Sequence, residues 1–340
     1  MTFENVRQII QNRESNLIFG NGFSKKLSEV ALSYTNLMHF AKSEIDKNSI
    51  LKLFFERLGS SDFELIHEYL TACAKTQQVF YQPGEFNNFD FSNAKRALNH
   101  IFCEAIKSAH PGKGDTEIFS DIDWQRVADY FQCFNNIFTT NYDLFSYWAL
   151  VELTHKKLYK YFDGFSYWMM KNKEKLAWGY YQNEQNFHFL HGALMLIPEP
   201  GGRLYKLKSQ YRCGGDSLLN LIQQSINQNK WPLFISDGDG SNKLSRIRNY
   251  EYLNHCYEKL ENAGGSLTTL GISFDRDDHL VSAINKSKID TIFIGVFNGD
   301  KTYLNKMTSL FDKKHCFAYC TESVDFKNLI MPNKCKLNQF

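Results

Sequence analysis

The chain has 340 residues, enough for one large domain or two modest ones with a substantial buried core. Its 39 Lys and Arg residues against 37 Asp and Glu residues give a formal charge of +2, and 43% of the residues are hydrophobic. This composition excludes a disordered chain, and it provides no field of one sign for nonspecific binding to nucleic acid or to an anionic membrane.

The first predicted strand ends in a glycine-rich turn. Residues 16–19 (NLIF) form an apolar run that breaks into GNGFS at 20–24, and helix-compatible sequence follows. This pattern predicts a strand, a tight turn and a helix. From residue 25 to 130 the apolar residues recur at helical spacing, so we expect a large, mostly helical insertion after the first strand.

Two further predicted strands end in polar residues. Residues 136–139 (NIFT) run into TNYD, and residues 187–190 (FHFL) run into His191 and Gly192. Side chains alternate along a strand, so His188 and His191 lie on opposite faces. We expect His191 to face a cleft and His188 to be packed, and this opposition also argues against a metal site built from the two.

Residues 142–185, between these two strands, are rich in aromatic side chains. One interpretation is a helical segment over the site that excludes water from it, and the other is hydrophobic core.

Four later apolar runs, at 231–235, 267–272, 291–296 and 316–319, alternate with amphipathic stretches such as 243–260 and 277–284. Strands that alternate with helices predict an α/β fold, here a doubly wound, mostly parallel Rossmann-like sheet in a single domain over 1–340. Ligands of such sheets bind beyond the carboxyl ends of the strands, which gives the polar motifs a common location.

Each motif alone has two interpretations. GNGFS is a phosphate-binding turn, or a plain strand-to-helix turn in which Ser24 caps the helix. Asn141 is a hydrogen-bonding group for a ribose or a water, or it closes an Asx turn with Asp143.

The order of the motifs is more specific, because a strand ending in GNGFS is followed by strands ending in TTNYD, in LHG and, late in the chain, in LGIS at 270–273. This succession resembles the sirtuin superfamily, in particular bacterial sirtuin-like domains of antiphage defence. The resemblance implies that NAD binds here and that Asn141 and His191 stand at the reaction centre. The residues that it implies for binding the dinucleotide are Gly20, Asn21, Gly22, Phe23, Ser24, Thr140, Asp143, Gly271, Ser273 and Asp278.

The chain lacks the two paired cysteines of the zinc module that sirtuin deacylases carry, so a deacylase is disfavoured and no metal is expected. The resemblance then implies an NAD hydrolase that cleaves the nicotinamide–ribose bond and depletes NAD in antiphage defence. The alternative is a noncatalytic module that senses NAD or an ADP-ribose-like nucleotide.

The eight cysteines are scattered, and no long apolar segment or exported leader is evident, so we expect a cytoplasmic protein with reduced thiols. We expect no binding to membranes and no direct binding to nucleic acid. Any self-association or protein activator would use the helical block at 25–130.

Overall fold

The computed structural model describes residues 1–27, 34–61, 63–79, 89–109, 121–159, 161–166, 175–179, 185–208, 218–235 and 240–327. Its centre is a six-stranded sheet with the order β12-β11-β10-β1-β2-β5, in which every neighbouring pair is parallel. The six strands are β1 (Ser15–Phe19), β2 (Asn136–Thr139), β5 (Phe187–Phe189), β10 (Gly264–Leu270), β11 (Lys288–Val296) and β12 (His315–Cys320). The predicted α/β fold with a parallel sheet is confirmed, and the architecture is compatible with a Rossmann-like fold.

The strand order reverses at β1, because β2 and β5 extend the sheet on one side of it and β10, β11 and β12 on the other. Strands β1 and β10 are both buried along nearly their whole length, as expected for central strands of a parallel sheet that is covered on both faces. In open parallel sheets the crevice at such a reversal is the usual ligand site. The carboxyl ends of β1, β2 and β10 therefore mark the place to look for one.

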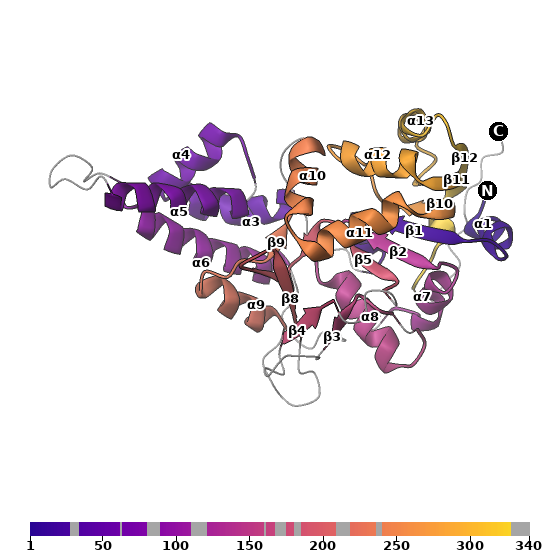
Figure 1. Cartoon of the computed structure of the whole chain (residues 1–340), viewed down its shortest axis with the longest axis horizontal. Coiled ribbons are helices and arrows are strands. Elements are labelled where there is room, and N and C mark those ends of the chain that lie inside the picture. The colour runs from indigo at the N-terminus through magenta and orange to yellow at the C-terminus, as the bar shows by residue number, and fades with distance from the viewer. Residues whose placement is uncertain are drawn as a thin grey trace.

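Helices cover both sides of this sheet, with α11 and α12 on one side and α7 and α8 on the other (Figure 1). The helices are α1 (Phe3–Ile10), α2 (Asn21–Leu27), α3 (Tyr34–Asp46), α4 (Ser49–Leu58), α5 (Phe63–Val79), α6 (Phe91–Ala109), α7 (Trp124–Phe131), α8 (Phe145–His155), α9 (Leu218–Asn227), α10 (Gly240–Arg248), α11 (Glu251–Glu261), α12 (Asp278–Lys286), α13 (Lys301–Leu310) and the 3-10 turn η3 (Thr321–Ser323). None of the described helices is long and apolar enough to cross a membrane.

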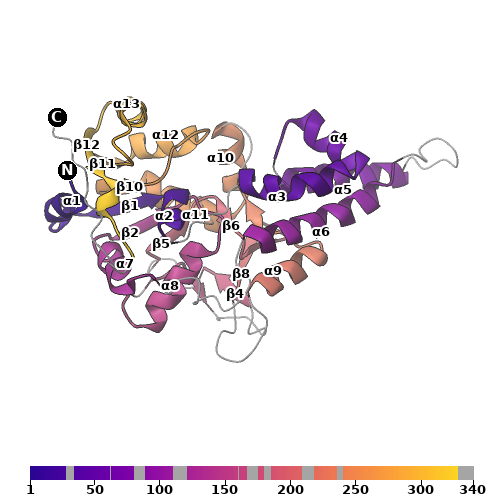
Figure 2. The same ribbon diagram turned by 180° about the vertical axis from the view of Figure 1, so that it is seen from behind.

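The segment between β1 and β2 contains helices α2 to α7. Of these, α3 to α6 lie together with α9 at one end of the molecule, away from the six-stranded sheet (Figure 2). Local sequence sets the ends of these helices: Asn48 accepts a hydrogen bond from the Leu51 N–H to cap α4, and Gly59, at φ +59°, ends it. Residues 28–33, 62, 80–88 and 110–120 of the predicted insertion fall outside the described part of the chain.

Two small antiparallel sheets were not predicted. One has the order β3-β4-β8-β7 and the other pairs β6 with β9. Their strands are β3 (Phe165–Ser166), β4 (Lys175–Trp178), β6 (Gly192–Ala193), β7 (Leu196–Glu199), β8 (Arg203–Leu207) and β9 (Leu233–Phe234). The apolar run at 231–235 therefore does not join the parallel sheet, because Gly192, at φ +81°, turns the chain after β5 so that β6 meets β9.

The aromatic segment 142–185 is helical only in α8 among its described residues, and strands β3 and β4 follow, so a helical segment over the whole range is wrong. The side chains of α8 are buried on nearly all of its faces, including Phe145, Tyr147 and Trp148. A helix that is buried on nearly all of its faces is core, so α8 packs the interior.

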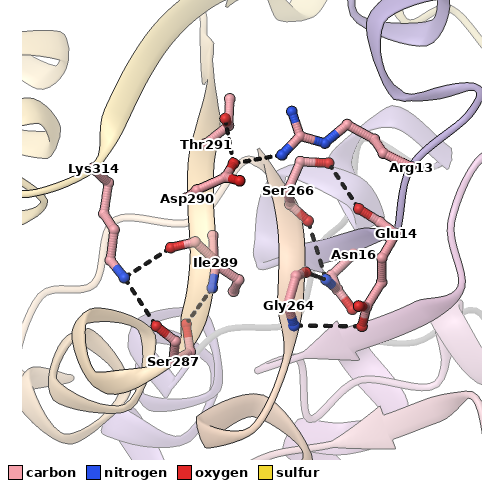
Figure 3. A network of polar contacts seen from close by, with 10 residues as sticks. All are labelled: Arg13, Glu14, Asn16, Gly264, Ser266, Ser287, Ile289, Asp290, Thr291 and Lys314. Atoms are coloured by element: carbon pink, nitrogen blue, oxygen red, sulfur yellow. Dashed lines mark hydrogen bonds and ion pairs between the residues drawn. The ribbon is translucent and has the colours of Figure 1, made fainter.

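Buried polar contacts fix the register of the sheet at the amino ends of its strands (Figure 3). The side-chain amide of Asn16 donates to the carbonyls of Gly264 and Ser266, at 2.8 and 3.1 Å, and its oxygen accepts from Asn136 at 3.0 Å. Asn16 is fully buried, so a slip of either neighbouring strand would leave its amide unpaired. This clamp on β1, β2 and β10 determines which residues lie at their opposite, carboxyl ends.

Candidate functional site

A cavity of about 710 Å³ opens at the carboxyl ends of the strands, beside the reversal of strand order. Its volume is in the range of small-molecule sites. Its lining comes from the β1–α2 turn, the ends of β2 and β5, the loop after β10, the end of β11, the start of α13 and η3. The lining residues are Gly20, Asn21, Gly22, Lys25, Lys26, Thr140, Asn141, Tyr142, His191, Leu270, Gly271, Ile272, Ser273, Phe274, Asp277, Gly295, Phe297, Asp300, Tyr303 and Thr321.

Three glycines bring the β1–α2 turn against the end of β10. The Gly22 N–H donates to the Gly271 carbonyl at 3.0 Å. A Cβ added at Gly22 would lie 2.5 Å from the Gly271 Cα, and one at Gly20 would lie 2.7 Å from the Gly271 oxygen. Only glycine permits this approach of two backbones, which forms the floor of the cavity. Because the Gly22 amide is already bonded, the turn offers fewer free N–H groups than its sequence suggests.

The loop from 271 to 277 has an unusual backbone. Gly271, Phe274 and Arg276 have φ values of +58°, +56° and +59°. Non-glycine residues rarely adopt this left-handed conformation, which costs roughly 1–2 kcal/mol each. Such strain persists where surrounding contacts hold it, and one of them is the Tyr303 hydroxyl, which donates to the Ile272 carbonyl at 2.7 Å. The loop holds Ser273 and Asp277 at the edge of the cavity.

A chain of hydrogen bonds connects the end of β2 with α2. The Asn141 side-chain amide donates to the Ser24 hydroxyl at 2.8 Å, and this hydroxyl donates to the Asp143 carboxylate at 2.7 Å. Burial raises the pKa of Asp143 to about 6, although the bonds from Ser24 and from the Phe145 N–H oppose this rise. With one amide hydrogen committed to Ser24, Asn141 has its carbonyl oxygen to offer a ligand.

Two histidines meet at the side of the cavity where β5 ends. The Nε2 atoms of His191 and His279 are 3.0 Å apart, and His191 Nε2 is 3.9 Å from the Asp277 carboxylate. The Lys243 ammonium donates to that same carboxylate oxygen at 2.7 Å. Burial, with a smaller contribution from Lys243, lowers the pKa of His191 to about 3, and burial together with His191 lowers that of His279 to about 3. Both rings are therefore neutral at pH 7.

The atoms of His191, Asp277 and His279 that could bind a metal lie within 4.8 Å of one another. Two neutral imidazoles and a carboxylate are suitable ligands for zinc. The Lys243 ammonium, however, already neutralises this carboxylate and adds positive charge where a cation would bind. The charge balance of the cluster is therefore satisfied by protein groups alone.

Two lysines contribute positive charge to the wall formed by α2. Lys25 and Lys26 line the cavity, and the Lys26 ammonium donates to the Val324 carbonyl at 2.7 Å. Burial lowers the pKa of Lys26, and the nearby carboxylates of Glu322 and Asp325 partly oppose this decrease. These charges would favour an anionic ligand beside the turn.

A family model described as "Domain of unknown function (DUF4917)" matches residues 17–329. The chain belongs to the DUF4917 family. No curated protein matches it. The match begins within β1 and ends beyond the last described residue, so it includes every element that lines the cavity.

The DUF4917 cavity brings together eight of the residues predicted for the site. They are Gly20, Asn21, Gly22, Thr140, Asn141, His191, Gly271 and Ser273. These residues come from four segments that are far apart in the sequence. His188 lies outside the cavity, as expected, and its ring is stacked on Phe138.

Four residues predicted to bind a dinucleotide do not line the DUF4917 cavity. The Phe23 ring packs in the core, 4.5 Å from the Phe19 ring centroid, because α2 turns this side chain inward. Ser24 and Asp143 lie behind Asn141 and bond to each other. Asp278 is the first residue of α12, and it is its neighbour Asp277 that faces the cavity.

Sequence reasoning missed His279, Lys243 and Tyr303 in this DUF4917 chain. His279 and Lys243 are in helices whose amphipathic pattern marks them only as partly buried, and Tyr303 is in α13. The one signal in the sequence was the position of His279 directly after Asp277 and Asp278, at the start of a helix that follows a strand end.

Proposed function

We propose that this protein hydrolyses the bond between nicotinamide and ribose in NAD, giving nicotinamide and ADP-ribose. The observation that carries the proposal is the shared cavity of Asn141, His191 and the glycine turn at the reversal of strand order. Gly271 and Ser273, the late part of the same motif succession, line it too. The lysines of α2 supply the charge that a pyrophosphate needs.

The chemistry suits a site without a strong acid. When the C1′–N bond of NAD breaks, its electron pair goes to the pyridinium nitrogen, and nicotinamide leaves as a neutral molecule. The ribose is left as an oxocarbenium-like cation, which a water attacks while losing a proton. The protein must then supply fixed dipoles, a positioned water and a proton acceptor.

Asn141 supplies a dipole without adding charge. Its side chain is held by Ser24, which is itself held by Asp143, so the amide is oriented before a ligand binds. Its carbonyl oxygen would orient the ribose hydroxyls or the attacking water. His191 is neutral at pH 7 and would accept the proton that the water releases.

The test is to incubate the purified protein with NAD and to separate the products by chromatography. Nicotinamide and ADP-ribose should appear with the wild type, and both Asn141→Ala and His191→Ala should reduce their formation by roughly 10²-fold or more. His188→Gln, a change in the core outside the cavity, is a matched control that should retain activity. Rates unchanged in both site variants would refute the assignment.

A noncatalytic sensor of NAD or an ADP-ribose-like nucleotide is the second candidate, and one observation favours it. The pKa of His191 is lowered to about 3 and its Nε2 faces His279, which makes it a weak base. Calorimetric binding of NAD with no nicotinamide after long incubation would support this role.

We further propose that the protein acts in the cytoplasm, where it depletes NAD in antiphage defence. In this proposal α3 to α6 form an insertion into the sheet domain and carry any surface for self-association or for an activator. Bacteria that express the wild type should lose NAD and resist phage infection, and bacteria that express Asn141→Ala should do neither.

A further inference from the structure

The contact between His191 and His279 requires a defined proton arrangement. A neutral imidazole has one N–H donor and one nitrogen acceptor, so two Nε2 atoms 3.0 Å apart must carry one hydrogen between them. Both side chains are almost fully buried, so water does not compensate for a lost partner. The rings are nearly parallel, at 28°, with centroids 5.2 Å apart.

Tyr257 contacts His279 from behind the pair. The backbone carbonyl of His279 accepts from the Tyr257 hydroxyl at 3.2 Å, and the two rings are nearly parallel, at 16°, whereas His279 Nδ1 has no hydrogen-bond partner among the described residues. Among the described residues, the charged groups that face the pair are Asp277, from the loop before α12, and Lys243, from α10. His279 does not line the cavity, whereas His191 does. His279 is thus a fixed partner behind the residue that faces the ligand.

We propose that His279 is a positioning residue that accepts a hydrogen bond from His191 Nε2–H when His191 takes up a proton from the attacking water. This inference rests on the proposed function. In the step, the proton moves from the water to His191 Nδ1, and the water oxygen forms the new bond to C1′. The resulting imidazolium donates to His279 Nε2, and the Asp277 carboxylate, which Lys243 also contacts, lies 3.9 Å from His191 Nε2.

This arrangement compensates for the weak basicity of His191. Burial and Lys243 disfavour the charged ring in the resting protein. A neutral acceptor in direct contact stabilises the charge only as it forms, which is what accelerates a reaction step. Replacing His279 should therefore affect turnover rather than binding of NAD.

Two substitutions of His279 separate hydrogen bonding from packing. His279→Phe keeps an aromatic ring beside Tyr257 and removes the acceptor, so kcat should fall about tenfold or more while KM stays unchanged. His279→Gln retains an amide that can accept from His191, so kcat should fall by about threefold or less. His188→Phe is the control for an equivalent change in the core, and thermal melting checks that each variant folds.

A second measurement does not depend on catalysis. In protein labelled with ¹⁵N-histidine, long-range ¹⁵N–¹H NMR spectra should show the Nε2 signal of His191 shifting in His279→Phe and returning toward its original position in His279→Gln. If the wild type does not hydrolyse NAD, the proposed function fails, and the catalytic role given to His279 fails with it, whereas the NMR spectra still test the hydrogen bond.

Three results would overturn the inference. One is an unchanged kcat in folded His279→Phe, and another is an unchanged His191 signal in that variant. The third is a stoichiometric metal in the purified wild type that is lost in both variants, because the two Nε2 atoms would then be metal ligands.

Discussion

Replacing His188 with Phe should make the protein less sensitive to acid. His188 is fully buried, its ring is stacked 4.7 Å from Phe138, and its Nδ1 is 3.0 Å from the Gln185 amide. Its Nε2 has no partner among the described residues. Burial is the main cause that lowers its pKa from 6.5 to about 3, with His255 and Lys259 adding to the effect.

The direction of this pH effect on stability follows from how many protons His188 binds in the folded and in the unfolded state. Above pH 6.5 the ring is neutral in both, and the stability is fully present. Below pH 6.5 the unfolded chain binds a proton that the folded protein refuses, so stability is lost as the pH falls toward 3. At about pH 5 the loss from this single group is about 2 kcal/mol relative to about pH 7.5.

Urea unfolding of the wild type and of His188→Phe at both pH values measures how much stability each protein loses between them. The Gln185 amide also donates to the Phe187 carbonyl, so the variant leaves it with an acceptor. Phe189→Leu, a buried and uncharged change on the same strand, should lower stability by roughly 1 kcal/mol at both pH values. The reasoning would be refuted if the wild type and His188→Phe lost the same free energy of unfolding between the two pH values.

Other substitutions test other parts of the structure. Gly271→Ala places a Cβ 2.3 Å from a neighbouring backbone atom at φ +58° and should cost several kcal/mol by urea unfolding, whereas Gly59→Ala, at φ +59° with open space around it, should cost about 1 kcal/mol. Lys206→Met leaves the buried carboxylate of Asp163 unpaired and should cost about 3–5 kcal/mol; adding Asp163→Asn should restore much of the loss, and no restoration would contradict the ion pair. Ser24→Ala should lower NAD hydrolysis and destabilise the protein by about 1–3 kcal/mol, and unchanged values of both would show that its two hydrogen bonds are dispensable.

The strands of the parallel sheet could be predicted because each is a short apolar run with a polar or glycine stop. The small antiparallel sheets could not, because strands of two residues such as β3, β6 and β9 leave no periodic pattern. Their pairing depends on turns, among them the one at Gly192, and on contacts between segments far apart in the sequence, such as β6 with β9. These are tertiary effects that a local window of sequence does not contain.

The residues at strand ends could be predicted to share a site because parallel strands place their carboxyl ends at one edge. Which residues face the ligand was harder to predict. Ser24 and Asp143 have the polar side chains expected of binding residues, yet the structure uses them to orient Asn141. The position of His279 could not be predicted, because it depends on how α12 packs against α10 and α11 rather than on the sequence of α12 itself.

The two anchors of the 271–277 loop explain how a strained segment can position a site. Tyr303 of α13 holds the Ile272 carbonyl, and Lys243 of α10 holds the Asp277 carboxylate. Both anchors come from helices with packing contacts of their own, α10 with α11 and α12 and α13 with β11, so protein groups hold the loop. The energy stored at Phe274 and Arg276 is then offset by the rest of the protein before any substrate arrives. A site held in this way has its dipoles fixed in advance, as stabilisation of a short-lived cation requires.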